Sequence, residues 1–215
     1  MDGSRTRLNA LFAADKVRRA AEEAFLDSTD ERTLARVIAE AVRDAWALED
    51  SEEQEGRLMR LADLSAQVPS PETIDALLTI LDHPEPAVRN EAGECLLDIA
   101  YERFKEVAHS IERLLSKGHS GPAMEELPFI LAEIRDPDPL PLIARFLGHK
   151  NAEAAAAAIE ALAGFGDPAA ISHLEKLRSD KREVTLPDLD DATVSLGDLA
   201  ADAIVELGGD SQDSA

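Results

Sequence analysis

Acidic side chains recur at equivalent positions along the second helices of a series of predicted helical pairs. With these helices aligned on their core leucines, the position opposite the core is acidic in four of five, and the fifth holds Phe129. Further carboxylates follow one helical turn later or on the same flank. Carboxylates attract cationic side chains, and an aromatic ring can anchor an apolar contact, so this chemistry fits a surface that binds protein. The predicted binding residues are Asp63, Glu94, Asp98, Glu125, Phe129, Glu133, Glu160, Asp198, Asp202 and Glu206.

A solvated polar face, which any surface helix must have, explains this pattern equally well. Metal chemistry is a third possibility, because His83, His119 and His149 all fall in turns between first and second helices. Stacked hairpins repeat at roughly 8–10 Å, whereas zinc ligands lie within about 2.0–2.1 Å of the ion. Three successive turns are too far apart to share one ion. We therefore predict no metal, no cofactor and no catalytic residues.

The elements that position these residues are predicted to be helices. Residues 77–100 form one helix, a turn at 83–86 with two prolines, and a second helix with apolar residues at helical spacing. First helices end at intervals of 34, 32 and 30 residues, at Leu81, Leu115, Leu147 and Leu177. Such intervals are typical of stacked helical hairpins. The predicted pairs are 30–48 with 54–68, 71–81 with 87–101, 104–116 with 121–135, 139–147 with 151–165, and 168–178 with 195–207.

Three segments complete a single predicted domain over residues 1–215. Residues 1–29 hold an N-terminal capping or adapter helix, residues 30–207 the repeats, and residues 208–215 a disordered tail. Acidic residues 49–55 are expected to form a turn. Residues 179–194 are a long insertion in the last repeat. This insertion either caps the open end of the stack, the interpretation we favour, or docks a partner through Leu186 and Leu189 among Asp180, Asp188, Asp190 and Asp191.

Composition limits the kinds of partner. Of 215 residues, 45% are hydrophobic and only 4% aromatic, which favours packed helices. The formal net charge of −22 repels nucleic acids and anionic membranes and attracts basic proteins. The charge can equally serve solubility alone. Cys95 is the single cysteine, and residues 1–25 lack the apolar run of a signal peptide, so we predict a cytoplasmic protein.

The stretch around the second repeat resembles a bacterial HEAT repeat, similar to those of the phycobilisome lyase group. The resemblance rests on Asp82, Pro86, Val88, Arg89, Ala92 and Leu96. It extends from Ser70 to Gly209, is weaker in the third repeat, and does not include residues 1–50. It implies an all-α, right-handed α-solenoid of about five HEAT-like hairpins plus the N-terminal helix. It also implies that Asp82 and Arg89 cap turns and link neighbouring repeats.

HEAT proteins are mostly scaffolds and binding modules, so the resemblance implies no chemistry. We predict a non-catalytic adaptor that binds a basic or amphipathic protein partner in an acidic concave groove. Two alternatives are an antitoxin-like immunity or inhibitor protein and a lyase- or chaperone-like accessory of a tetrapyrrole-carrying protein. A purely architectural element is a further possibility. The sequence leaves the partner and the oligomeric state open.

Overall fold

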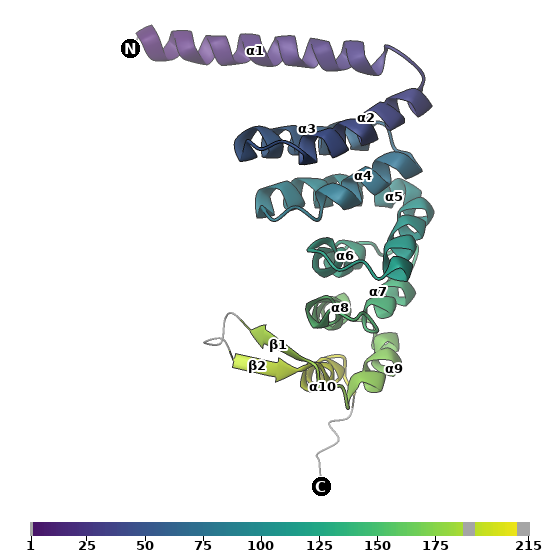
Figure 1. Ribbon diagram of the computed structural model, residues 1–215. Helices are drawn as coiled ribbons and strands as arrows, with labels where there is room; N and C mark the ends of the chain where they lie inside the picture. Colours follow the sequence, from purple (N-terminus) through teal and green to yellow (C-terminus); the bar gives the residue numbers. More distant parts are fainter. Residues whose placement is uncertain (1, 187–191, 210–215) are drawn as a thin grey trace.

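The chain folds as an α-solenoid whose helices stack in one direction (Figure 1). The computed structural model describes residues 2–186 and 192–209. Its elements are α1 (Asp2–Leu26), α2 (Glu31–Trp46), α3 (Ser51–Gln67), α4 (Pro71–Ile80), α5 (Pro86–Lys117), α6 (Ala123–Ala132), α7 (Leu140–Phe146), α8 (Ala152–Phe165), η1 (Pro168–Ala170), α9 (Ile171–Leu174), η2 (Glu175–Leu177), β1 (Glu183–Leu186), β2 (Ala192–Ser195) and α10 (Leu196–Glu206).

The five predicted helical pairs are confirmed. They are α2 with α3, α4 with the first part of α5, the second part of α5 with α6, α7 with α8, and α9 with α10. Helix α5 contains two predicted helices, joined without a turn at Arg103, whose φ of −129° and ψ of 38° are not helical. The prediction of an acidic turn up to residue 55 was wrong. Helix α3 already begins at Ser51, because Asp50 caps it and acidic residues suit the positive end of a helix.

One main apolar core runs along most of the stack. It extends from Val42 on α2 to Leu207, and a second, smaller cluster of Leu34, Ala35, Ile38 and Val68 lies beside α1. Helix α8 contributes buried alanines, whose small side chains allow neighbouring helices to approach closely. Phe146 of α7 is the largest of the fully buried side chains among the described residues. Because each pair contacts mainly its neighbours, every helix keeps its place by stacking. The second helices α6, α8 and α10 thereby present one continuous face.

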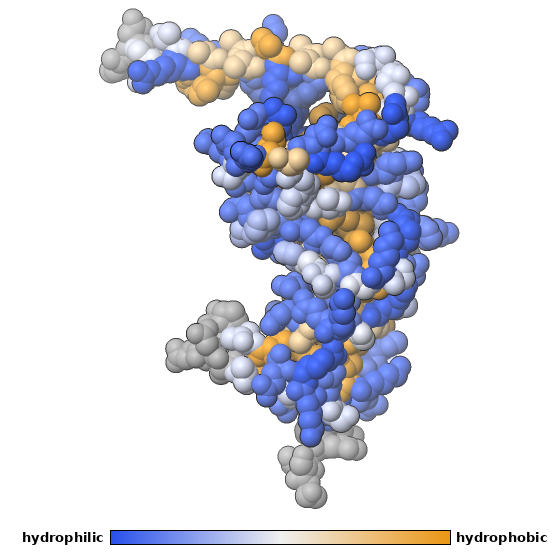
Figure 2. Space-filling model, viewed as in Figure 1, coloured by the Kyte–Doolittle hydropathy of each residue, from blue (hydrophilic) through white to orange (hydrophobic). Residues whose placement is uncertain are grey.

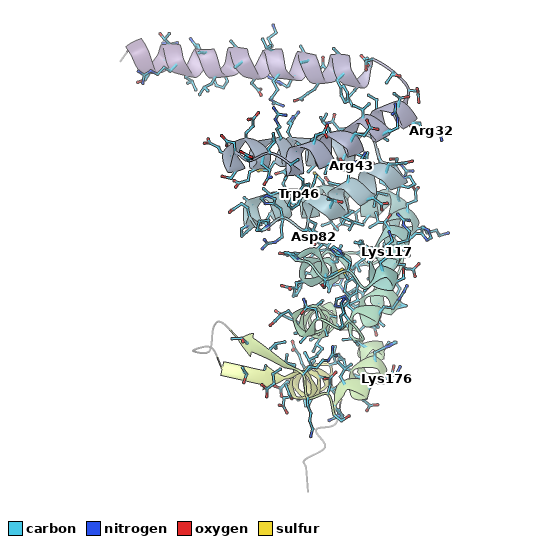
Figure 3. All side chains as sticks on the ribbon, viewed as in Figure 1. Arg32, Arg43, Trp46, Asp82, Lys117 and Lys176 are labelled. Atoms are coloured by element: carbon cyan, nitrogen blue, oxygen red, sulfur yellow. The ribbon has the colours of Figure 1, made fainter. Side chains whose placement is uncertain are left out.

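Polar contacts between successive turns reinforce the stack. The Nε2 atom of His83 lies 3.0 Å from Gln54 Oε1 in the preceding pair. His149 Nε2 lies 2.7 Å from the carbonyl oxygen of His119. His119 itself contacts Asp82, which is labelled in Figure 3. The three turn histidines therefore join consecutive repeats, each by its own contact.

Asp82 and Arg89 also connect repeats. Asp82 Oδ1 accepts a hydrogen bond from the backbone N–H of Ala123 at 3.0 Å, at the start of α6. Arg89 Nε donates to Glu126 Oε1 at 3.0 Å and Nη1 donates to the carbonyl oxygens of His83 and Pro84. Each side chain thus contacts its own turn or the next repeat. The capping role that the family resemblance implied for both residues stays a prediction.

Part of the insertion forms a β-hairpin, which the sequence analysis did not predict. Strands β1 and β2 pair antiparallel, with Glu183 opposite Ser195 and Val184 opposite Val194. Val184 is 3% exposed and packs into the main core. Asp180 forms an ion pair with Arg182 at 2.6 Å. The predictions for Asp188, Leu189, Asp190, Asp191 and the tail from residue 210 onward lie outside the described residues.

Helix α1 lies across the other end of the stack and packs on it only near its C-terminus. Phe25 and Leu26 contact a small cluster on α2 and α3, whereas Leu11 and Phe12 are 66% and 64% exposed. Apolar surface accordingly runs along α1 in the space-filling view (Figure 2). The predicted capping role thus applies only to the last turns of this helix. Within the described part of the chain, no helix is long and apolar enough to span a membrane.

Candidate protein-binding groove

Two adjoining hollows lie along the inner face of the solenoid, and we call them together the groove. The C-terminal hollow has a volume of about 490 Å³ and lies between α6, α8, β1 and α10. The central hollow has a volume of about 250 Å³ and lies between α5 and α6. Glu126 and Phe129 line both hollows. Phe129 therefore stands at the junction of the groove, with 39% of its surface exposed.

The C-terminal hollow combines an apolar floor with an acidic rim. Val184 of β1 contributes to the floor together with Ala156 and Ile159 of α8 and Leu199 of α10. No Lys or Arg lines this hollow among the described residues. Its acidic residues are Glu125, Glu126, Glu153, Glu160, Asp202 and Glu206. The negative potential of this rim is therefore not neutralised from within the hollow.

The structure brings seven of the ten predicted binding residues to the groove. Five line the C-terminal hollow, namely Glu125, Phe129, Glu160, Asp202 and Glu206. Glu94 and Glu133 line the central hollow, again with Phe129. They reach one face because second helices at successive positions expose the same side. Binding by these residues stays a prediction.

Three predicted residues lie outside both hollows. Asp198 belongs to the cap of α10, where its backbone N–H donates to Ser195 Oγ at 3.1 Å and its carboxylate accepts from that hydroxyl at 2.6 Å. Asp63 forms an ion pair with Arg60 at 2.5 Å. Asp98 is exposed on α5 but lines neither hollow. The acidic column therefore does not continue as one groove along the entire stack.

Asp63 instead belongs to a cluster with Glu91 and Cys95. One potential ligand atom from each of these three residues lies within 4.8 Å of the others. Burial, reinforced by Asp63, raises the pKa of the Glu91 carboxyl. Burial also raises the pKa of the Cys95 thiol to about 12. Groups of acidic side chains at this spacing are common without a metal ion, and nothing else at the cluster indicates a ligand, so we assign no metal to it.

Sequence reasoning missed three residues that shape the C-terminal hollow. Glu126 and Glu153 were not included because only one or two positions were taken from each second helix. Val184 was missed because the surrounding aspartates concealed the alternating Val-Thr pattern of a strand.

Burial raises the pKa of Glu125, while Asn151 donates a hydrogen bond of 3.2 Å to its Oε1 and partly offsets that effect.

The class of protein is defined by this architecture: an all-α solenoid of stacked helical hairpins. Residues 126–186 match the family model of HEAT repeats, which supports a HEAT-repeat protein. The matched segment runs from α6 to β1 and supplies much of the C-terminal hollow. A crystal structure of an engineered protein is 20% identical, over 87% of this chain and 97% of that one, with a TM-score of 0.36 that carries no argument. No curated protein matches the chain.

Proposed function

We propose that the chain is a non-catalytic protein-interaction module that binds a basic or amphipathic helical segment in the groove. The observation that carries this proposal is the C-terminal hollow, where six carboxylates surround an apolar floor and none of the described lining residues is Lys or Arg. HEAT repeats generally serve as protein-interaction scaffolds, which agrees with this role.

Two physical effects support binding in this hollow. Glu126 is paired with Arg89, but the other five rim carboxylates form no ion pair with a described side chain. These five attract cationic segments and raise their association rate, because low-dielectric walls focus the potential into the hollow. The floor and Phe129 then offer apolar area that a partner can bury, at roughly 25 cal/mol for each Å². An amphipathic helix with basic flanks satisfies both requirements, whereas a uniformly polar segment leaves the floor exposed.

The residue types lining the groove do not favour nucleophilic catalysis or tetrapyrrole attachment. In both hollows the described lining includes neither His nor Cys nor Ser. Ser and Cys activated by His are the usual nucleophiles of covalent catalysis, and Cys or His would be the expected attachment or ligand residues for a tetrapyrrole. No observation on the groove favours the lyase-like alternative.

A peptide-binding measurement tests the proposal. The probe is a labelled helical model peptide of leucine and lysine, and the measurement is fluorescence anisotropy at low and moderate salt. In the groove variant, Glu160→Gln, Asp202→Asn and Glu206→Gln remove three rim charges. We expect binding to weaken at least tenfold, about 1.4 kcal/mol, and to weaken further as salt rises.

The matched control removes three exposed charges that line neither hollow, through Asp44→Asn, Glu102→Gln and Glu175→Gln. Net charge changes equally in both variants, so a difference between them reports the location of the charges. Equal losses in the two variants would reduce the effect to net charge and contradict a groove.

A further inference from the structure

Helix α1 carries apolar side chains that the described residues leave largely exposed. Leu8 is 48% exposed, and Leu11, Phe12 and Val17 are between 64% and 71% exposed. Isolated exposed apolar residues such as Val17 are ordinary, but Leu8, Leu11 and Phe12 lie close together on one side of the helix, which is a typical feature of an interaction surface. The only described side chains that hold α1 to the stack lie near its C-terminal end, where Glu22 pairs with Arg60 and Phe25 and Leu26 are packed.

The N-terminal part of this helix has a charge opposite in sign to that of the rest of the chain. Residues 1–21 contain five Lys or Arg and two Asp or Glu, whereas residues 22–215 contain 17 and 42. Arg18 and Arg19 already pair with Asp15. Arg5, Arg7 and Lys16 form no ion pair with any described side chain. The N-terminal half of α1 therefore presents positive charge that no described side chain pairs.

The two features coincide on one side of the helix. At 100° per residue, Leu8, Leu11 and Phe12 form an apolar ridge. Arg5 and Lys16 follow on one flank of this ridge, and Arg7 lies on the other. An apolar ridge with basic flanks is the counterpart of an apolar floor with an acidic rim.

The sizes also agree. Residues 5–16 of a helix extend about 17 Å. The C-terminal hollow extends across α6, α8 and α10, and neighbouring helices pack at roughly 8–10 Å, which gives a span of about 16–20 Å. Two to three turns of α1 can therefore lie along the hollow with charges opposite the rim at both ends.

We propose that the groove of one chain binds the N-terminal half of α1 from a second copy of the same chain. This inference rests on the proposed function of the groove and names its partner. Leu8, Leu11 and Phe12 contact the apolar floor beside Phe129, while Arg5, Arg7 and Lys16 pair with rim carboxylates. Such a contact joins different surfaces of the two copies, so it builds head-to-tail assemblies.

The donor is a second copy because α1 cannot reach the groove of its own chain. In Figure 1, α1 lies at the opposite end of the solenoid from α8 and α10. Its C-terminal end is fixed to α2 and α3, and only residues 27–30 connect it to α2. An anionic membrane is the less favoured partner, because the strongly acidic remainder of the chain would approach the same surface.

Sedimentation velocity of the full chain over a concentration series tests the inference. We expect assembly that increases with concentration and declines as salt rises. The donor variant Leu8→Ser, Leu11→Ser, Phe12→Ser should weaken self-association at least tenfold, as should the groove variant. The matched control Ala10→Ser, Ala13→Ser, Ala20→Ser changes exposed positions of α1 outside the ridge and should assemble like the original chain.

Mixing the two defective variants gives the decisive result. The donor variant keeps an intact groove and the groove variant keeps an intact α1, so an equimolar mixture should form a one-to-one heterodimer. A mixture that stays monomeric overturns the inference. So does loss of assembly in the donor variant alone, which would indicate contact between two α1 helices.

Two further results separate this inference from the proposed function. If the leucine–lysine peptide binds the groove but the chain does not self-associate at any salt concentration, the groove stands and its assignment to α1 falls. Cosedimentation of the monomeric chain with phosphatidylserine vesicles would overturn the inference in favour of a membrane. If neither peptide nor second copy binds, both proposals fail.

Discussion

The two ends of the solenoid are completed differently. At the C-terminal end, the hairpin folds back against the stack, with Val184 buried in the main core. Arg182 donates hydrogen bonds to the carbonyl oxygens of His149, at 2.5 Å, and Leu147. At the N-terminal end, α1 is held by two apolar side chains and the ion pair between Glu22 and Arg60. Most of its apolar surface is exposed.

This difference shows that an end of a solenoid can be closed in more than one way. A terminal repeat must have a solvent-compatible outer face. The hairpin buries Val184 in the main core of its own chain, and it also forms a wall of the C-terminal hollow. Helix α1 instead offers its apolar ridge to another molecule. In this interpretation the N-terminal end of one chain supplies the helix that the groove near the C-terminal end of another chain binds.

The largest expected difference between the two ends is in the effect of a glycine-to-alanine substitution on the free energy of unfolding. A Cβ added at Gly197, where α10 begins, would lie 2.8 Å from the carbonyl oxygen of Arg178 and 3.0 Å from that of Asp180. Because both contacts are to backbone, Gly197→Ala should destabilise the fold by about 3 kcal/mol. Chemical denaturation followed by circular dichroism measures this loss.

The matched change at the other end is Gly56→Ala in the middle of α3. Apart from the neighbouring residues and local backbone of α3, no described atom lies within 4 Å of the added Cβ, and alanine is the better helix former. This variant should gain about 0.5–1 kcal/mol. Equal behaviour of the two variants would mean that α10 does not pack tightly on residues 178–180.

Valine truncation should produce the next largest difference. Val184 is 3% exposed and Val17 is 71% exposed. Val184→Ala removes two buried methyl groups and should cost about 2 kcal/mol. Val17→Ala should change the free energy of unfolding by less than about 0.5 kcal/mol. Thermal unfolding of both variants measures the difference, and a comparable cost at Val17 would show that α1 is covered in solution.

The sequence predicted the repeated part of the fold well. Proline-containing turns and apolar residues at helical spacing located all five pairs, and the bend at Arg103 separates the two predicted helices of α5. The same periodicity placed seven of ten candidate residues in the groove. Local signals suffice here because each repeat contacts mainly its neighbours.

Features that depend on tertiary contacts were not predictable in the same way. Asp198 has the spacing of a groove residue, yet its carboxylate accepts from the Ser195 hydroxyl at the α10 cap. Asp63 also fits the register, but Arg60 and Glu91 surround it. The hairpin brings Val184 into the hollow from a distant part of the sequence. Periodicity within a helix contains no information on such neighbours.

The smallest predicted effect is on the pH dependence of the free energy of unfolding. It compares Glu91, in the cluster with Cys95, and Glu125, on the rim of the C-terminal hollow. Burial raises the pKa of Glu91 in the Cys95 cluster and of Glu125 in the C-terminal hollow. The folded state therefore holds protons that the unfolded state has lost, in a window that begins near the ordinary value of 4.5. Stability contributed by these groups is present below that value and declines as pH rises through the raised folded-state pKa.

Asp180 acts in the opposite direction, because its hydrogen bond with Arg182 lowers the pKa of its carboxyl. Its contribution is lost only as pH falls below about 3.8. Because the raised pKa values of Glu91 and Glu125 make stability decline as pH rises, Glu91→Gln and Glu125→Gln should each reduce that decline between pH 4.5 and 8. The reduction should be roughly 0.5 kcal/mol or less, because both side chains contact water. Urea denaturation across this range measures the slopes.

The two variants should nevertheless differ in binding. Glu91 lines neither hollow, whereas Glu125 lies on the acidic rim of the C-terminal hollow. At neutral pH, Glu125→Gln should weaken both peptide binding and self-association, and Glu91→Gln should leave both unchanged. If the two substitutions weakened binding equally, net charge rather than rim position would control association, and the distinction between the acidic cluster and the groove would be lost.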